Sequence, residues 1–187
     1  MATALWLIRH AETDWAKAGK HTGLTDIPLN ADGRAHAATL PERLVGQEFS
    51  AVFVSPLSRA RETAELAGLG DQAQVRPDLV EYDYGDYEGI TTDEIHETNP
   101  DWYPWRDGVP YGELPNDVGA RADRVIAEAL EVDGDVALVA HGHVLRVVGA
   151  RWVEQPASFA GRLALSTGAI CRLGFERGVR VVRAWNH

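Results

Sequence analysis

The stretch Ala4-Leu5-Trp6-Leu7-Ile8, which stops at Arg9-His10, is the first of three short apolar runs in this chain. The second run covers residues 51–54 and stops at residues 55–59, and the third covers residues 136–140 and stops at His141-Gly142-His143. Short apolar runs bounded by turn residues are typical of buried parallel strands. Ligands of α/β sheets bind beyond the carboxyl ends of such strands. We therefore expect arginines and histidines from three strands to line one crevice, where a histidine acts as nucleophile on an anion.

These runs alternate with helical patterns, which predicts an α/β domain. Helices are expected over about residues 57–67, from a cap at Asn116 or Asp117 through Ala129, and over residues 142–152. We expect a three-layer α/β/α arrangement with a mainly parallel sheet, as a single domain over residues 1–187. Residues 82–114 show little periodicity, so this stretch is expected to be an irregular, lid-like insertion that forms the rim of the pocket.

Shorter elements are predicted from local signals. A helix capped by Asn30 is expected to end at Gly46, with the side chains of Ala35, Ala38 and Leu44 facing the core. Val75 is placed in a short strand. Residues 163–173 and 179–184 are expected to form a hairpin around a tight turn.

The composition is that of an ordinary globular chain of 187 residues, 45% of them hydrophobic and 25% charged. The formal net charge of -10 argues against a general nucleic-acid binder and against binding to anionic membranes. Cys171 is the single cysteine, so no intrachain disulfide can form, and its apolar surroundings place it in the core. No run is long enough to cross a membrane and no leader is recognised, so a cytoplasmic protein is expected.

The residues at the strand ends suit the transfer of a phosphoryl group. A histidine nucleophile needs a neutral ring with one nitrogen free, and the backbone around His10 can hold the other nitrogen. Arg9 and Arg59 offer permanently charged, planar donors for phosphate oxygens, and a protonated His141 would add another. The leaving alkoxide needs a proton, and its candidate donors are Glu81, Asp83, Asp86 and Glu88.

Each of these residues also has a structural interpretation. Arg9 would pair with Glu12 on the surface, and Arg59 would belong to a solvated helix face. His141 and His143 would be two ligands of a metal, but residues two apart on a helix do not share a face, and no third ligand is signalled. The coincidence of three strand ends favours the catalytic interpretation.

The chain resembles the histidine phosphatase superfamily, in its phosphoglycerate-mutase-like branch. The matching motifs run in the order of the family and cover nearly the whole chain. Residues 9–13, Arg-His-Ala-Glu-Thr, are similar to the opening Arg-His-Gly-Glu motif of the family. Residues 22–29 are similar to its next loop, and residues 55–64 are similar to its second phosphate segment. Residues 81–89 are similar to its acid loop, residues 112–113 to its Gly-Glu motif and residues 139–142 to the segment with its second histidine.

The resemblance implies a role for each matched residue. His10 would form a phosphohistidine, and Glu81 would donate the proton to the leaving group and then activate water. Phosphate and substrate contacts would come from Arg9, Arg59, His141, Gly142, Thr22, Gly23 and Tyr84. No metal or organic cofactor is implied, and the partner would be a small phosphorylated metabolite. Whether the chain forms a homo-oligomer stays open.

Two departures from the family pattern bear on the reaction. Ala11 replaces a glycine, which is acceptable if its φ is negative. Thr92 stands near the position of the lysine with which the mutases bind their acidic substrate. We therefore expect a phosphatase of small phosphate monoesters, with sugar phosphates as candidates, similar to the sedoheptulose-bisphosphatase and acid-phosphatase subgroup. The alternatives are a phosphoglycerate mutase and a non-catalytic protein that binds a phosphorylated ligand.

The insertion offers one further hypothesis. Trp102, Trp105 and Arg106 lie where a lid over the leaving group would sit, and Arg106 would then influence substrate preference. The alternative is that the tryptophans only anchor the loop to the core.

Overall fold

A six-stranded sheet organises the chain, whose computed structural model describes residues 4–187. The strands lie in the order β3-β2-β4-β1-β5-β6. Their bounds are β1 Leu5–Arg9, β2 Ala51–Val54, β3 Ala73–Val75, β4 Val136–Ala140, β5 Ile170–Glu176 and β6 Val179–Ala184. The first four strands are parallel to one another, whereas β5 pairs with β1, and β6 with β5, in antiparallel fashion. The expected mainly parallel sheet is confirmed.

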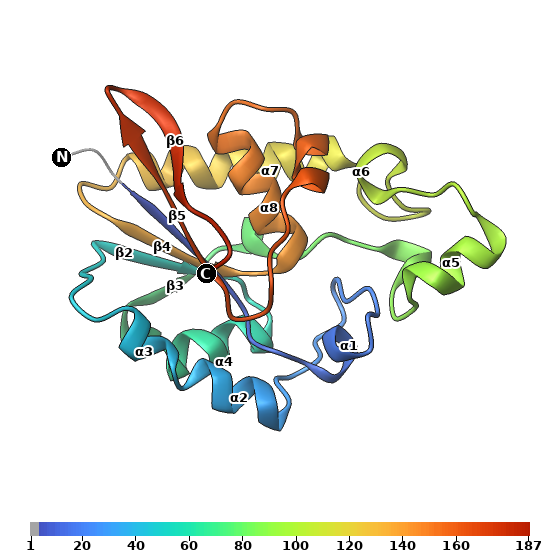
Figure 1. Cartoon of the computed structure of the whole chain (residues 1–187), viewed down its shortest axis with the longest axis horizontal. Helices are drawn as coiled ribbons and strands as arrows, with labels where there is room; N and C mark the ends of the chain where they lie inside the picture. The colour runs from blue at the N-terminus through green and yellow to red at the C-terminus, as the bar shows by residue number, and fades with distance from the viewer. Residues whose placement is uncertain (1–3) are drawn as a thin grey trace.

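Helices cover both faces of this sheet (Figure 1). The helices on one face are α7 (Pro115–Leu130) and α8 (Gly142–Trp152), and those on the other are α2 (Ala31–Ala37), α3 (Leu40–Arg43) and α4 (Ser58–Leu66). Side chains alternate along β1, so Leu5 and Leu7 enter the first core and Ile8 enters the second. The three-layer α/β/α fold is therefore confirmed.

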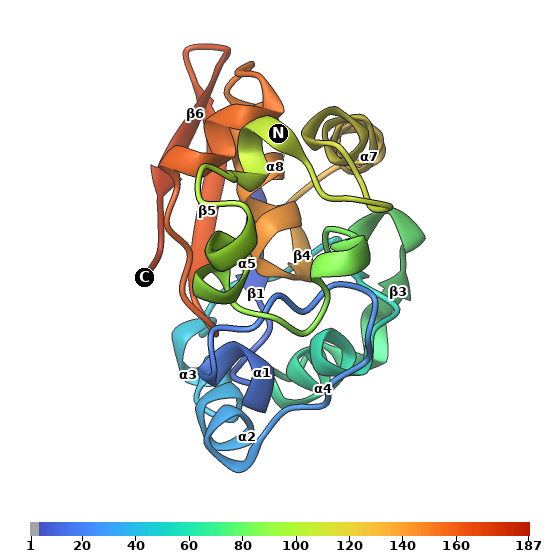
Figure 2. The same ribbon diagram turned by 90° about the vertical axis from the view of Figure 1, so that its right-hand side faces the viewer.

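The insertion contains more regular structure than its sequence suggested. Its elements are the 3₁₀ turn η3 (Gly85–Tyr87), α5 (Thr92–Thr98) and α6 (Pro104–Asp107). Thr91 caps α5, because its hydroxyl accepts from the Glu94 N–H while the Glu94 carboxylate accepts from the Thr91 N–H. Figures 1 and 2 show the insertion beyond the end of the sheet where β1 and β4 end. The elements elsewhere are α1 (Asp14–Lys17) and the 3₁₀ turns η1 (Gly70–Gln72), η2 (Pro77–Leu79) and η4 (Ala157–Arg162).

The register of the parallel strands brings three strand ends together. Arg9 on β1 is level with Ala140 on β4, and Val54 on β2 is level with Val139 on β4. The residues that follow these strands, His10, Ser55 and His141, therefore emerge at one edge of the sheet. The expected convergence of the three apolar runs is confirmed.

The predicted helix after Asn30 was wrong in its length and in two of its three inward residues, whereas Leu44 is buried as expected. Asn30 caps α2 as expected, but the chain forms two short helices, and Ala35 and Ala38 are exposed. The inward residues are Gly33, Ala37, Leu40 and Leu44. The cause is the close approach of Gly33 to the backbone: a Cβ there would lie 2.1 Å from the Glu12 carbonyl oxygen. This contact turns the glycine face of α2 toward the core.

Two element boundaries also differ from the prediction. Leu114, not Asn116 or Asp117, precedes α7, because Pro115 suits the first helical position. Asp117 instead accepts the Leu114 N–H over 2.9 Å from within the first turn. The first strand of the hairpin starts at Ile170 rather than near residue 163, because Gly168, with φ +68°, turns its N–H toward the carbonyl oxygens of Arg9 and His10.

Other local predictions are confirmed. The structure places α4, α8 and the short strand at Val75 within one or two residues of their expected bounds. Cys171 is buried in the core. None of the helices in the described part of the chain has the length and apolar character needed to cross a membrane.

Candidate active site

A cavity of about 190 Å³ lies beyond the ends of β1 and β4. Among the residues expected at the site, those that line it are Arg9, His10, Thr22, Glu81 and Tyr84. Lys20, His21 and His143 line it as well. The cavity therefore combines the end of β1, the loop after α1, the acid loop and the start of α8.

His10 is held with one ring nitrogen free. Its Nδ1 lies 2.7 Å from the Ala11 carbonyl oxygen, which can only accept, so Nδ1 carries the proton and Nε2 carries a lone pair. Burial, followed by the charges of Arg9 and Arg59, lowers the pKa of His10 well below its ordinary value. The ring is therefore neutral and nucleophilic. Ala11 has a negative φ, so its replacement of the family's glycine causes no strain.

Arg59 and His141 are fully buried, next to His10 rather than on the cavity surface. The rings of His10 and His141 are 5.1 Å apart. Arg59 Nε donates to His141 Nδ1 over 3.1 Å, and because arginine only donates, the proton of His141 is on Nε2. That Nε2 lies 2.6 Å from Ser55 Oγ. Burial, followed by the charge of Arg59, lowers the pKa of His141 well below its ordinary value, so the protonated His141 expected from the sequence is not the state that the structure favours.

Arg59 also fixes the loop that carries Thr22 and Gly23. Its Nη2 donates to the carbonyl oxygens of Gly23 and Thr22 over 2.8 and 3.2 Å, and its Nη1 donates to that of Thr25 over 3.0 Å. Gly23 does not line the cavity, and a Cβ there would lie 2.5 Å from the Tyr82 carbonyl oxygen. Arg59 is therefore a buried positive charge whose donors are largely used by the protein, not a residue of a solvated helix face.

Arg9 keeps donors available for a ligand. Its Nη1 donates to the Leu165 carbonyl oxygen and its Nε is fully buried, so Nη2 is the nitrogen that is neither paired within residues 4–187 nor fully buried. The alternative pairing with Glu12 is not observed in this part of the chain, where Glu12 accepts from Asn30 instead. Gly142 gives Arg9 room, because a Cβ there would lie 3.1 Å from Arg9 Cζ.

Glu81 is the carboxylate of the acid loop that lines the cavity, and it sits against the N-terminus of α8. Its Oε1 accepts the N–H groups of Tyr82 and Val144, both over 2.9 Å, whereas Oε2 accepts that of His143 over 2.9 Å. Glu88 is turned away, toward the N–H of Gly23. Of the four candidate carboxylates that residue chemistry alone left open, Glu81 is the one that lines the cavity.

Arg121 on α7 holds the chain segment that carries Glu81. Its Nη1 donates to the carbonyl oxygen of Asp78 over 2.6 Å, and its Nε and Nη2 donate to the Glu113 carboxylate over 2.7 and 2.8 Å. Glu113 in turn accepts the Asp83 N–H over 3.0 Å. The ion pair therefore fastens both sides of the acid loop to the long helix.

Several residues of the site were missed from the sequence, and Lys20, which lines the cavity, is one of them. Ser55 follows β2 directly, and that position was its only signal. His143 was set aside because helical spacing was applied to His141 and His143, but His141 is the extended residue before α8, with φ -122°, so this spacing does not govern the pair. His21 had no signal in the sequence, and burial lowers its pKa to about 4.

The tryptophans of the insertion support the cavity wall rather than cover it. Trp105 stacks on His143 with ring centroids 4.6 Å apart, and Trp102 meets His21 edge-on at 5.4 Å. Both tryptophans are buried. These contacts agree with the anchoring alternative.

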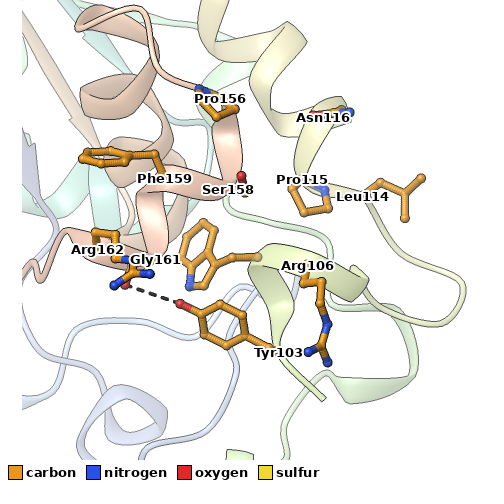
Figure 3. A pocket seen from close by; sticks show the side chains of 11 residues that line it. Tyr103, Arg106, Leu114, Pro115, Asn116, Pro156, Ser158, Phe159, Gly161 and Arg162 are labelled. Atoms are coloured by element: carbon orange, nitrogen blue, oxygen red, sulfur yellow. Dashed lines mark hydrogen bonds between the residues drawn. The ribbon is translucent and has the colours of Figure 1, made fainter. Parts of the chain in front are cut away.

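Arg106 faces a different region of the surface. It lines a larger, open hollow of about 980 Å³ together with Leu114 and Arg162. Figure 3 shows Arg106 on the side of this hollow opposite Phe159. Its guanidinium is exposed and paired with Asp107. The structure therefore gives no support to the hypothesis that Arg106 covers the leaving group.

Over residues 4–187, no cluster of three or more histidine, cysteine, aspartate or glutamate side chains is arranged to hold a metal ion. The cationic groups beside His10 are instead the two arginines, Arg9 and Arg59.

Known proteins share both the sequence and the fold. The model of the histidine phosphatase superfamily (branch 1) matches residues 5–187. An acid phosphatase of Mycobacterium tuberculosis is 44% identical over 181 residues, which cover 94% of this chain and 88% of that protein. Sedoheptulose 1,7-bisphosphatase of Saccharomyces cerevisiae is 35% identical over 178 residues, which cover 78% of this chain and 66% of that protein.

A solved structure of an open reading frame from Mycobacterium tuberculosis is 41% identical and superposes with a TM-score of 0.92. The superposition covers 98% of this chain and 97% of that chain. The family model, the relatives and the fold agree with the resemblance read from the motifs. The chain therefore belongs to the histidine phosphatase superfamily.

Proposed function

We propose that the chain hydrolyses phosphate monoesters of small metabolites through a phosphohistidine on His10, without a metal ion. One observation carries the proposal: the Ala11 carbonyl holds Nδ1–H of His10, which leaves the Nε2 lone pair free. Arg9 and Glu81 line the same cavity. The relatives named acid phosphatase and sedoheptulose bisphosphatase support hydrolysis of small phosphate esters.

In the first step, His10 Nε2 attacks phosphorus, the N–P bond forms and the bond from phosphorus to the ester oxygen breaks. Arg9 donates to the phosphoryl oxygens, and the buried charge of Arg59 adds to the positive potential. His141 gives up the contact of its Nε2–H with Ser55 Oγ, and this N–H then donates to a phosphoryl oxygen, as Arg9 does. Glu81 protonates the leaving oxygen, and Oε2 is the atom with capacity for that proton because it accepts one N–H where Oε1 accepts two.

In the second step, the Glu81 carboxylate takes a proton from water. The resulting hydroxide attacks phosphorus, the N–P bond breaks and inorganic phosphate leaves. His10 returns to its neutral state, and Glu81 is again protonated. The cycle needs no group beyond the side chains that surround the cavity.

The leaving group would lie toward the insertion, which we propose as the rim of the pocket. Thr22 and Tyr84 line the cavity on this side, together with Lys20 and His21. A volume of about 190 Å³ suits a phosphate and a short carbon skeleton. Sugar phosphates and related metabolites are therefore the proposed substrate class.

The role of Glu81 can be tested by varying the leaving group. Glu81→Gln should lower kcat/KM, which reports the first step and not the later hydrolysis of the phosphohistidine, by about 10²–10⁴-fold for alkyl phosphates, because their alkoxide needs a proton. The loss should be much smaller for p-nitrophenyl phosphate, whose leaving group departs as an anion. The matched control is Asp83→Asn, because that carboxylate does not line the cavity and an amide oxygen can still accept the Gly85 N–H. Equal losses on both ester types would contradict a proton donor at this position.

The reaction itself is tested with a panel of metabolite phosphates, including sugar bisphosphates and phosphoglycerates, in the presence of a chelator. We expect release of inorganic phosphate. Rapid interconversion of phosphoglycerates with little phosphate release would establish a mutase instead. Tight binding without turnover across the panel would identify a binding protein.

A further inference from the structure

His143 lines the catalytic cavity but has no part in the two steps above. It is the second residue of α8, and about 20% of its side chain is exposed. Its backbone N–H donates to Glu81, so its ring stands beside the proposed proton donor, with Nδ1 4.0 Å from Glu81 Oε2. A side chain in this place would meet the leaving group.

The ring of His143 is held in one orientation. Trp105 stacks on it at 4.6 Å with an interplanar angle of 22°, and Tyr82 and Tyr84 meet it edge-on at 6.1 and 5.5 Å. Its Nδ1 lies 2.5 Å from the Tyr84 hydroxyl. The hydroxyl contact is made by Nδ1 and not by Nε2, so the two ring nitrogens have different surroundings.

The surroundings also fix the proton. Burial raises the pKa of Tyr84 well above its ordinary value, so the hydroxyl keeps its proton. Within residues 4–187 the partner of that buried hydroxyl is His143 Nδ1, and a buried donor without an acceptor is costly. Tyr84 therefore donates and Nδ1 accepts. Because burial lowers the pKa of His143 well below its ordinary value, the ring is neutral and its proton is on Nε2.

The donor at Nε2 has no partner within the described chain. Among residues 4–187, the fully buried side-chain nitrogen or oxygen that lacks a hydrogen-bond partner is Arg9 Nε. His143 Nε2 also lacks a partner, so this atom must be at least partly exposed. The exposed part of the side chain lines the cavity. Tyr84 and His143 thus present a preoriented N–H to whatever occupies the leaving-group side.

We propose that His143 Nε2–H donates to an oxygen atom of the leaving group and makes His143 a specificity-determining residue that favours esters of polyhydroxylated alcohols over esters of plain alkyl alcohols. The inference rests on the proposed phosphatase function and adds the substrate feature that the site recognises. An alkyl leaving group would bury this N–H without an acceptor, and a site built to bond an oxygen rejects ligands that lack it.

The test compares glycerol 1-phosphate with propyl phosphate, which share a three-carbon chain and differ in two hydroxyl groups. We expect the wild-type protein to have the higher kcat/KM on glycerol 1-phosphate. His143→Phe removes the donor and keeps a flat ring under Trp105, and it should reduce the ratio of the two kcat/KM values by about five- to tenfold. His143→Gln can place an amide N–H near the position of Nε2 and should restore most of the preference.

The matched control is His96→Phe, because His96 lies in the insertion, bonds the Trp102 carbonyl and does not line the cavity. It should leave the ratio of the two kcat/KM values unchanged. An unchanged ratio in His143→Phe, or an equal loss on both esters, would overturn the proposal. If the wild-type protein hydrolyses neither ester, calorimetric Kd values for the same two esters decide the role of His143, and the panel of metabolite phosphates decides the proposed function separately.

A second readout does not depend on turnover. Imidazole nitrogen NMR of the wild-type protein should show His143 protonated at Nε2 and unprotonated at Nδ1, and Tyr84→Phe should change the Nδ1 signal. A proton on Nδ1 in the wild-type protein would overturn the proposal, because Nε2 could then only accept.

Discussion

Removal of Arg121 should loosen the acid loop and slow catalysis together. The Arg121 side chain is 11% exposed and that of Glu113 is 20% exposed, so their bidentate ion pair is largely withdrawn from solvent. Arg121→Met removes this pair and the bonds to the backbone at Asp78, Val80 and Glu81. Loss of one partner of a buried pair typically costs about 3–5 kcal/mol, and the partial exposure here favours the lower end, about 3 kcal/mol. Because the freed segment carries Glu81, kcat on alkyl phosphates should fall by up to about 100-fold.

Urea unfolding at neutral pH measures the first effect, and steady-state kinetics on one alkyl phosphate measures the second. Arg124→Met is the matched control, since Arg124 lies three residues along α7 and its pair with Asp78 is on the surface. It should leave both measurements near those of the wild-type protein. The double variant Arg121→Met with Glu113→Gln should be less destabilised than the sum of the two single variants, because no uncompensated carboxylate remains. A loss below about 1 kcal/mol in Arg121→Met, the range of an exposed pair, would refute this account of the loop.

Three further predictions follow from the same contacts. Burial lowers the pKa of His21 to about 4 and those of His10, His141 and His143 well below their ordinary value, so the unfolded chain binds more protons than the folded one below about pH 6.5. The free energy of unfolding should therefore fall as pH drops from 7 toward 4, by at most about 1.4 kcal/mol per pH unit for each histidine. A flat urea-unfolding profile over this range would contradict the prediction. Arg106→Ala should leave kcat/KM within about twofold on every substrate, because Arg106 lines the separate hollow. A change in kcat/KM for one substrate class alone would show that Arg106 does contact the leaving group. Gly142→Ala should raise KM on all esters, because the new Cβ would lie 3.1 Å from Arg9 Cζ. The substitution should not destabilise helix α8, because alanine favours a helix over glycine by up to about 1 kcal/mol. An unchanged KM would show that Arg9 can shift without loss of substrate binding.

The strand ends were predictable because burial leaves a simple pattern in the sequence. Runs such as residues 4–8 are apolar on both faces of the sheet, and the residues after each run are placed by the register alone. That is why His10 and His141 could be expected together before their contacts were known. The helix after Asn30 was misplaced because its orientation depends on the contact of Gly33 with a distant backbone, which no periodicity records.

The divisions of labour within the site could not be predicted from residue types. Arg9 and Arg59 are chemically alike, but only tertiary contacts show that Arg59 is bonded to the 22–25 loop while Arg9 keeps donors free. The tautomer of His143 depends on Tyr84, which is 59 residues away in the chain. Such roles arise from hydrogen-bond partners that the fold alone brings together.

The central claim is that His10 Nε2 carries the phosphoryl group. The most direct measurement is rapid acid-free quenching of the enzyme during turnover of a labelled phosphate ester, followed by mass spectrometry of the peptide that contains His10. We expect an acid-labile, base-stable phosphate on His10 at Nε2, and no labelling and no turnover in His10→Asn. Label on a different residue, or normal turnover in His10→Asn, would contradict the account.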